Sequence, residues 1–100
     1  MCEKYYIISL KHTHEDEQYL TLWRPDNSGY CYFREYAGVY DGYEKGYHDL
    51  DNNIPVQKKV LDEMFVEVEY RGKKVNAVLN TPENRKILGI RKNQRNTQRT

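Results

Sequence analysis

The sequence is poor in the residues on which several specialised classes of protein depend. Only two of its 100 residues are cysteines and three are prolines, and no apolar run approaches the roughly 20 residues that span a membrane. With Cys2 beside the initiator methionine and no Cys-x-x-Cys pair, we expect neither a disulfide framework nor a redox motif. Glu3 and Lys4 interrupt the first ten residues, which argues against a signal peptide. These absences predict a cytoplasmic protein with no membrane segment.

Aliphatic residues are also scarce. Leu, Ile, Val and Phe together make up about one residue in five, near the lower limit for a chain that folds by itself. The ten tyrosines must therefore contribute to the buried surface. The length is that of one ordinary domain. We expect a single small domain with a thin core, which homodimerisation would help to bury.

Charge is balanced over the whole chain but not along it. Residues 1–82 hold ten Lys/Arg and fourteen Asp/Glu, whereas residues 83–100 hold six Lys/Arg and one Glu. The last ten residues, 91–100, have almost no apolar side chain, so we predict a disordered basic tail after a domain of residues 1–90. Such a tail can contact nucleic acid. Alternatively, it only solubilises the chain or folds back onto the acidic body.

The first third of the chain has the pattern of an antiparallel sheet. Residues 4–11, 19–24 and 30–33 are rich in aromatic and β-branched side chains and predict three strands. The polar segment 12–18 predicts a loop. Residues 25–29 are dense in turn formers.

The next segment, residues 34–53, has no clean period. Its glycines recur every four residues, and we predict a long Tyr/Gly-rich loop with at most one short helical turn. From Pro55 the apolar residues follow helical spacing, which predicts a helix over residues 55–65.

The last part of the domain is more regular. Residues 66–70 alternate strictly and predict a strand, followed by a turn at 71–74 and a partner strand at 75–79. Thr81 and Pro82 have the pattern of a helix start, with Ile87 and Leu88 docking the helix and Gly89 ending it. The predicted fold is α+β: a small antiparallel sheet with two short helices on one face.

One sequence cluster has the composition of a metal site. His12 and His14 lie two residues apart beside Glu15 and Asp16, and imidazoles suit zinc or nickel. A specific site needs three or four ligands, and His48 is the only other histidine. Solvated loop side chains explain the pattern more simply, so we expect neither a metal nor another cofactor.

Catalytic patterns are equally weak. Cys31 has no histidine beside it in sequence, and burial is the commoner role of a lone cysteine. His48 and Asp49, with Asp41 and Glu44 nearby, could form an acid/base pair, but carboxylates in polar loops are ordinary. The glycine spacing matches neither a phosphate-binding loop nor a dinucleotide-binding loop. We therefore assign no catalytic residue.

The strongest indication of function is a cluster of aromatic residues. Residues 19–49 hold seven of the ten tyrosines, the only tryptophan and two arginines. Aromatic rings stack on bases, and arginine pairs with phosphate through a forked geometry. The alternative is a tyrosine-rich core patch in which the arginines pair with nearby acids. The predicted binding residues are Trp23, Arg24, Tyr30, Tyr32, Arg34, Tyr36 and Tyr40.

The first half of the chain contains a Lys-His-Thr segment at residues 11–13, a Trp-x-Pro strand end at 23–25 and an Ala-Gly-x-Tyr element at 37–40. In these elements it resembles small phage and prophage proteins. It implies an accessory or anti-defence role, in which such a protein sequesters a nucleotide signal or blocks a host protein.

The leading hypothesis is therefore a non-enzymatic binding protein for a phosphorylated, nucleotide-like ligand or a host protein. One alternative is a nucleic-acid-binding protein that uses the basic tail. A weaker alternative is a small hydrolase or metal protein built on His12, His14 and His48.

Overall fold

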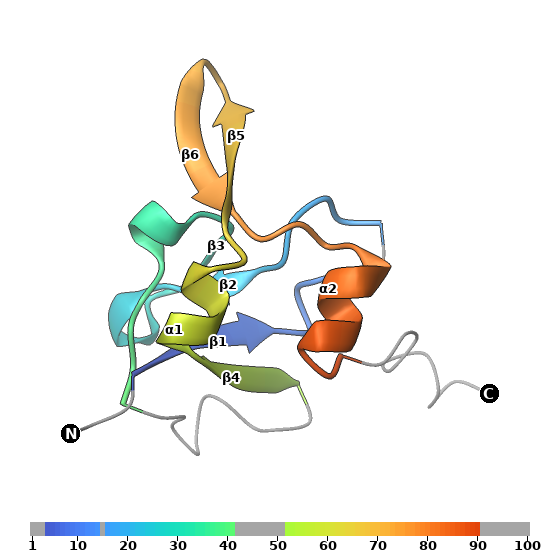
Figure 1. Cartoon of the computed structure of the whole chain (residues 1–100). Coiled ribbons are helices and arrows are strands. Elements are labelled where there is room, and N and C mark those ends of the chain that lie inside the picture. Colours follow the sequence, from blue (N-terminus) through green and yellow to red (C-terminus); the bar gives the residue numbers. More distant parts are fainter. Residues whose placement is uncertain (1–3, 15, 42–51, 91–100) are drawn as a thin grey trace.

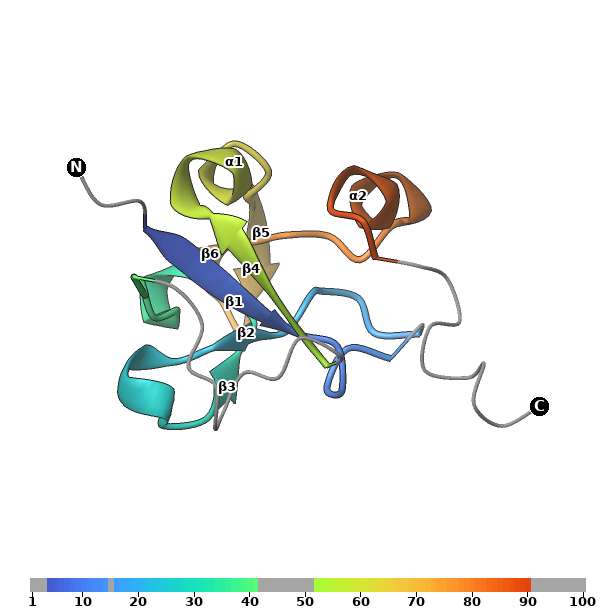
Figure 2. The same ribbon diagram turned by 90° about the horizontal axis from the view of Figure 1, so that it is seen from below.

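The chain folds into a small antiparallel sheet with two short helices on one of its faces (Figure 1). The computed structural model describes residues 4–14, 16–41 and 52–90. Figure 2 shows both helices on the same side of the sheet, which confirms the predicted α+β class. The strands are β1 (Tyr5–Ser9), β2 (Leu22–Trp23), β3 (Tyr30–Cys31), β4 (Asn53–Gln57), β5 (Val66–Tyr70) and β6 (Lys73–Ala77). The helices are α1 (Lys58–Asp62) and α2 (Pro82–Ile87), with 3-10 turns η1 (Pro25–Asn27) and η2 (Arg34–Tyr36).

The main sheet has the strand order β3-β2-β1-β4 and buries side chains on both faces. Successive residues of a strand point to opposite faces, so Ile8 faces the helices while Ile7 faces away from them. On the face away from the helices, Ile7 packs with Trp23 and Tyr40. The helix-side cluster is larger and comprises Tyr6, Ile8, Leu10, Leu20, Leu22, Val56, Leu61, Val78 and Ile90.

Strand β4 corrects two predictions. Residues 53–57 were expected to be the end of a loop and the start of a helix, but they form the outer strand beside β1. Pro55 lies opposite Ile7 in this register. Proline lacks a backbone N–H and is tolerated in an edge strand, where that donor is not needed. The predicted helix was too long. Its apolar pattern included Val56, which belongs to β4, together with residues of the short helix α1.

The rest of the segment 34–53 is described only in part. Its start forms the 3-10 turn η2, the short helical turn that the sequence predicted. Tyr40 then forms an isolated antiparallel bridge with Tyr5. Residues 42–51 lie outside the described residues, and so does the predicted tail, 91–100.

The β5–β6 hairpin is a separate two-stranded sheet and does not extend the main one. Its turn consists of Arg71 and Gly72, with φ angles of 53° and 80°. Two residues with positive φ build the turn whose twist matches a hairpin, so β6 begins earlier than the predicted residue 75. In Figure 1 the hairpin projects from the body of the protein.

Helix α2 begins as the sequence predicted. The side-chain oxygen of Thr81 accepts a hydrogen bond from the backbone N–H of Asn84 at 3.1 Å, and Pro82 occupies the first turn. Gly89, at φ 78°, follows the helix end. The docking residues are Leu88 and the buried Ile90, because Ile87 is largely exposed, contrary to the prediction. Neither helix is long and apolar enough to cross a membrane.

Candidate functional site

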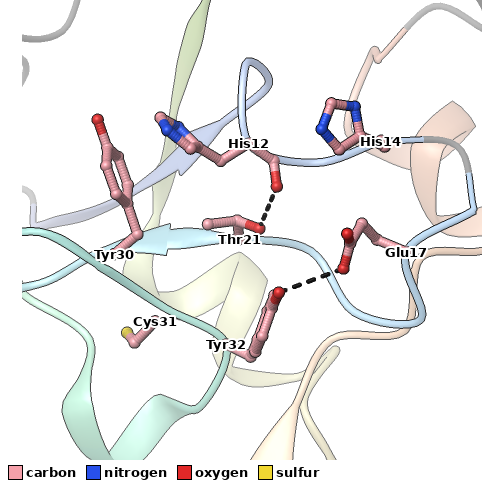
Figure 3. A pocket seen from close by; sticks show the side chains of 7 residues that line it. All are labelled: His12, His14, Glu17, Thr21, Tyr30, Cys31 and Tyr32. Carbon is pink, nitrogen blue, oxygen red and sulfur yellow. Dashed lines mark hydrogen bonds between the residues drawn. The ribbon is translucent and has the colours of Figure 1, made fainter.

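A cleft of about 330 Å³ opens beside β2 and β3 (Figure 3). Tyr30 lies opposite Trp23 in the β2–β3 pairing, and Trp23 packs with Ile7 on the face away from the helices. The alternation of side chains along a strand places Thr21 on the same face as Trp23. The cleft therefore uses the sheet face that the helices leave uncovered. Its lining residues are His12, His14, Glu17, Thr21, Tyr30, Cys31 and Tyr32.

A pair of buried threonines holds one wall of the cleft. The hydroxyl of Thr13 donates to the backbone carbonyl of Ser9 at 2.6 Å and accepts from the backbone N–H of Thr21 at 2.9 Å. The hydroxyl of Thr21 donates to the carbonyl of His12 at 2.8 Å. These bonds continue the pairing of β1 with β2 beyond the regular ladder. They give the segment after β1 a defined position above the sheet.

The imidazole of His12 packs against the ring of Tyr30. Their centroids lie 3.9 Å apart, and the ring planes are inclined by 31°. The Nδ1 atom of His12 shares a hydrogen bond with the hydroxyl of Ser9 at 3.0 Å. A serine–histidine pair can serve nucleophilic catalysis, but this serine is only 1% exposed. The pair therefore orients the imidazole, and Tyr30, which is 39% exposed, presents the accessible ring.

Tyr32 and Glu17 form the other end of the cleft. The phenol of Tyr32 donates to Oε1 of Glu17 at 3.2 Å, as Figure 3 shows. Burial, together with the charge of Glu17 and this hydrogen bond, raises the pKa of Tyr32. The phenol therefore stays protonated at neutral pH and keeps its donor. The carboxylate retains further acceptor positions that can face the cleft.

Cys31 is partly buried between the cleft and the helix-side cluster. Its thiol packs against the helix-side cluster and lies 3.7 Å from the carbonyl oxygen of Phe33, to which it donates. Burial raises the pKa of this thiol. Thiol reactivity requires the thiolate, so these contacts do not favour a nucleophile.

Two of the seven predicted binding residues, Trp23 and Tyr40, belong to the core. The indole of Trp23 is only 7% exposed, and its Nε1 donates to Oδ1 of Asn53 at 2.8 Å. The hydroxyl of Tyr40 donates to the carbonyl of Arg24 and accepts from the backbone N–H of Asn27 at 3.0 Å. The thin aliphatic core explains both placements, because aromatic rings supply the missing buried area.

The two predicted anion-binding arginines lie outside the cleft and have different partners. The guanidinium of Arg24 lies 5.5 Å from the ring centre of Tyr36. Arg34 lies on the helix side of the sheet, with Nε 3.5 Å from Asp62 and the guanidinium 5.8 Å from the ring centre of Phe65. Of the seven predicted residues, only Tyr30 and Tyr32 line the cleft.

The structure brings together other residues that were not predicted to bind ligand. His12 and His14 both line the cleft, and Glu17 and Thr21 complete the polar lining. Strand alternation was the signal that could have found Thr21, which shares a face with Trp23. No group of three metal-ligating side chains occurs within the part of the chain that the structure describes, from which His48 is absent.

Comparison of the chain with family models, with curated proteins and with solved structures gives no match. The lining of the cleft provides an exposed aromatic ring, two imidazoles, a carboxylate and hydroxyl groups. These groups suit recognition of a flat, polar molecule by stacking and hydrogen bonding.

Proposed function

We propose that this protein is a non-enzymatic binding protein whose cleft holds the base of a nucleotide-like small molecule. The single observation that carries the proposal is the placement of Tyr30, Tyr32 and Glu17 around one cavity of about 330 Å³. That volume is at the lower end of the usual range for ligand pockets, which runs from roughly 300 to 1,000 Å³. A ligand of one base and one sugar matches it better than a dinucleotide.

Each lining group has a role in this proposal. The ring of Tyr30 is 39% exposed, with the imidazole of His12 at 3.9 Å and the indole of Trp23 at 4.8 Å between ring centroids, and its exposed part offers an aromatic contact for a base. The carboxylate of Glu17, held by Tyr32, accepts hydrogen bonds from the amino or imino groups of a base. Among the lining residues, the imidazoles of His12 and His14 can donate hydrogen bonds and would face a phosphate. Arg24 and Arg34, first expected in that role, have partners elsewhere.

The resemblance to phage and prophage proteins adds a biological setting to this proposal. A small protein that holds a nucleotide without converting it lowers the concentration of that nucleotide. Such sequestration would serve an anti-defence role. The alternative of a host-protein partner would concern a different part of the surface.

Trp23 provides the measurement for the proposal. It is the only tryptophan, and its ring touches Tyr30, so a ligand stacked on Tyr30 should change its fluorescence. We would titrate the protein with mono-, di- and cyclic nucleotides. Loss of base stacking in Tyr30→Ala should weaken binding about tenfold to hundredfold, since stacking on an aromatic ring contributes roughly 1 to 3 kcal/mol per base. Glu17→Gln should change the preference among bases, because one acceptor oxygen becomes a donor.

Tyr36→Ala is the matched control. Tyr36 is also an exposed tyrosine, but it packs with Arg24 and does not line the cleft. This variant should bind like the wild type. If no nucleotide changes the fluorescence and none binds in calorimetry, or if Tyr36→Ala weakens binding as much as Tyr30→Ala, the cleft is not a nucleotide site.

A further inference from the structure

The projecting β5–β6 hairpin is attached to the rest of the protein through the backbone of β6 and through the rings of Tyr70 and Phe33, whose centroids lie 4.9 Å apart. Ala77 of β6 bridges to Phe33, and the carboxylate of Glu35 accepts from the backbone and side-chain N–H groups of Asn76 at 3.2 and 2.9 Å. The opposite edge of the hairpin is the outer edge of β5. Within the residues that the structure describes, no strand lies beside that edge.

The turn geometry determines which backbone groups of β5 point outward. In a hairpin closed by a two-residue turn such as Arg71-Gly72, the residues flanking the turn exchange hydrogen bonds, and bonded and non-bonded pairs then alternate. The bonded pairs are Tyr70 with Lys73, Val68 with Val75 and Val66 with Ala77. Glu67 and Glu69 occupy the non-bonded positions. Their backbone N–H and C=O groups therefore face away from β6.

The side chains of β5 present two different faces to a neighbour. Val66 and Tyr70 are 41% and 40% exposed, on the same face as Val68. Glu67 and Glu69 are exposed on the other face, and neither carboxylate has an ion-pair partner among the residues that the structure describes. An added strand would thus meet apolar residues at alternate positions and acidic residues between them.

We propose that the outer edge of β5 docks an extended segment of a partner protein in which basic and apolar residues alternate. Such a segment would add a third strand to the hairpin through the outward backbone groups of Glu67 and Glu69. Its Lys or Arg side chains would lie opposite these two carboxylates, and its apolar side chains opposite Val66, Val68 and Tyr70. The surface shares no residue with the lining of the cleft, so the proposal does not depend on the proposed function.

The charge pattern argues against a second copy of the same chain. Antiparallel pairing of two β5 strands about a twofold axis at Val68 places Glu67 of one copy opposite Glu69 of the other. Like charges directly opposite each other destabilise a strand pair. The acidic edge therefore selects against self-pairing and in favour of a basic partner.

Two labelled peptides test the side-chain pattern in the full-length protein. Fluorescence anisotropy should show binding of Val-Lys-Val-Lys-Val and at least tenfold weaker binding of Val-Glu-Val-Glu-Val. The double variant Glu67→Gln/Glu69→Gln should lose about tenfold affinity for the lysine peptide, as expected for two exposed ion pairs. Glu67→Lys/Glu69→Lys should reverse the preference. Equal binding of both peptides, or no binding of either at millimolar concentration, would overturn the proposal.

The backbone contacts have a test of their own. Glu69→Pro removes an N–H that β6 does not use, so the hairpin should still form while the peptide binds more weakly than it does to Glu69→Gln. Hydrogen exchange tests the same backbone contacts in the wild-type protein, without any substitution. The amides of Glu67 and Glu69 should exchange rapidly alone and slowly with the peptide, whereas those of Val68 and Tyr70 should be protected in both states. Fast exchange at Glu67 and Glu69 with peptide bound would show that it binds elsewhere.

Discussion

The hydroxyl of Tyr6 donates a hydrogen bond to Oδ1 of Asp62 at 2.6 Å, between two residues 56 positions apart in sequence. Oδ2 of Asp62 accepts from Lys58 at 2.8 Å, and Arg34 lies 3.5 Å from the same carboxylate. One side chain thus connects β1, α1 and η2. Because a five-residue helix is not stable by itself in water, these contacts and the burial of Leu61 hold α1 in place.

The first prediction concerns stability at alkaline pH. Burial, followed by the hydrogen bond to Asp62 and its charge, raises the pKa of Tyr6 from 10.0 to about 12. Folding favours the neutral phenol. Its contribution to the free energy of unfolding is therefore complete below pH 10.0 and is lost as the pH rises through the folded-state pKa. Between about pH 8 and about pH 11, the free energy of unfolding measured in urea should fall less for Tyr6→Phe than for the wild type. An unchanged difference between the two proteins would contradict this.

The second prediction concerns stability at acid pH. Burial by itself would raise the pKa of Asp62, but the hydrogen bonds from Lys58 and Tyr6 and the charges of Lys58 and Arg34 together hold it below 3.8. The stabilisation is therefore present above pH 3.8 and lost as the pH falls through the lower folded-state value. Asp62→Asn should be less stable at neutral pH and should show a shallower acid transition. Glu63→Gln, next to it in sequence, is the control and should leave the transition unchanged.

The third prediction concerns Trp23. Truncation of this buried indole to alanine should lower the free energy of unfolding by about 3 to 5 kcal/mol, as for other buried aromatic residues. Trp23→Phe should cost less, because it keeps most of the packing and loses mainly the hydrogen bond to Asn53. Thermal unfolding followed by circular dichroism measures both. A Trp23→Ala variant as stable as the wild type would show that the indole does not support the core.

The fourth prediction concerns Gly38. A Cβ atom added here would lie 2.8 Å from backbone atoms of Arg24 and Pro25, and the backbone N–H of Gly38 donates to the carbonyl of Trp23 at 2.9 Å. Because backbone cannot move aside as a flexible side chain can, Gly38→Ala should destabilise the fold by about 1 to 3 kcal/mol. Val39→Ala, at an exposed position beside it, should change stability by less than about 0.5 kcal/mol. Similar melting temperatures for both variants would contradict the argument.

Local patterns predicted the elements that local contacts decide. The alternation of Val66–Tyr70, the caps around Thr81 and the glycine after α2 each act within a few residues, and the structure shows β5 and α2 there. The α+β class followed from these elements and from the three strand patterns in the first third of the chain. Strand β4 was missed because Pro55 resembles a helix start, and only its pairing with β1 shows that it occupies an edge.

The candidate site depended more on long-range contacts. Composition indicated the tyrosines as candidate binding residues, and among the predicted residues Tyr30 and Tyr32 line the cleft. It could not separate rings that face the cleft from rings that replace missing aliphatic side chains in the core, such as Trp23 and Tyr40.

The sequence by itself determined the periodicity, the turns and the need for aromatic residues in a small core, because these follow from the chemistry of neighbouring residues. Only the tertiary structure decided which face of the sheet the helices cover and therefore which face carries the cleft. That choice places His12 against Tyr30 and Glu17 against Tyr32, and sends Arg34 to Asp62 on the opposite side. The physical reason is that burial is shared among distant segments, so the exposure of any one ring depends on the packing of all the others.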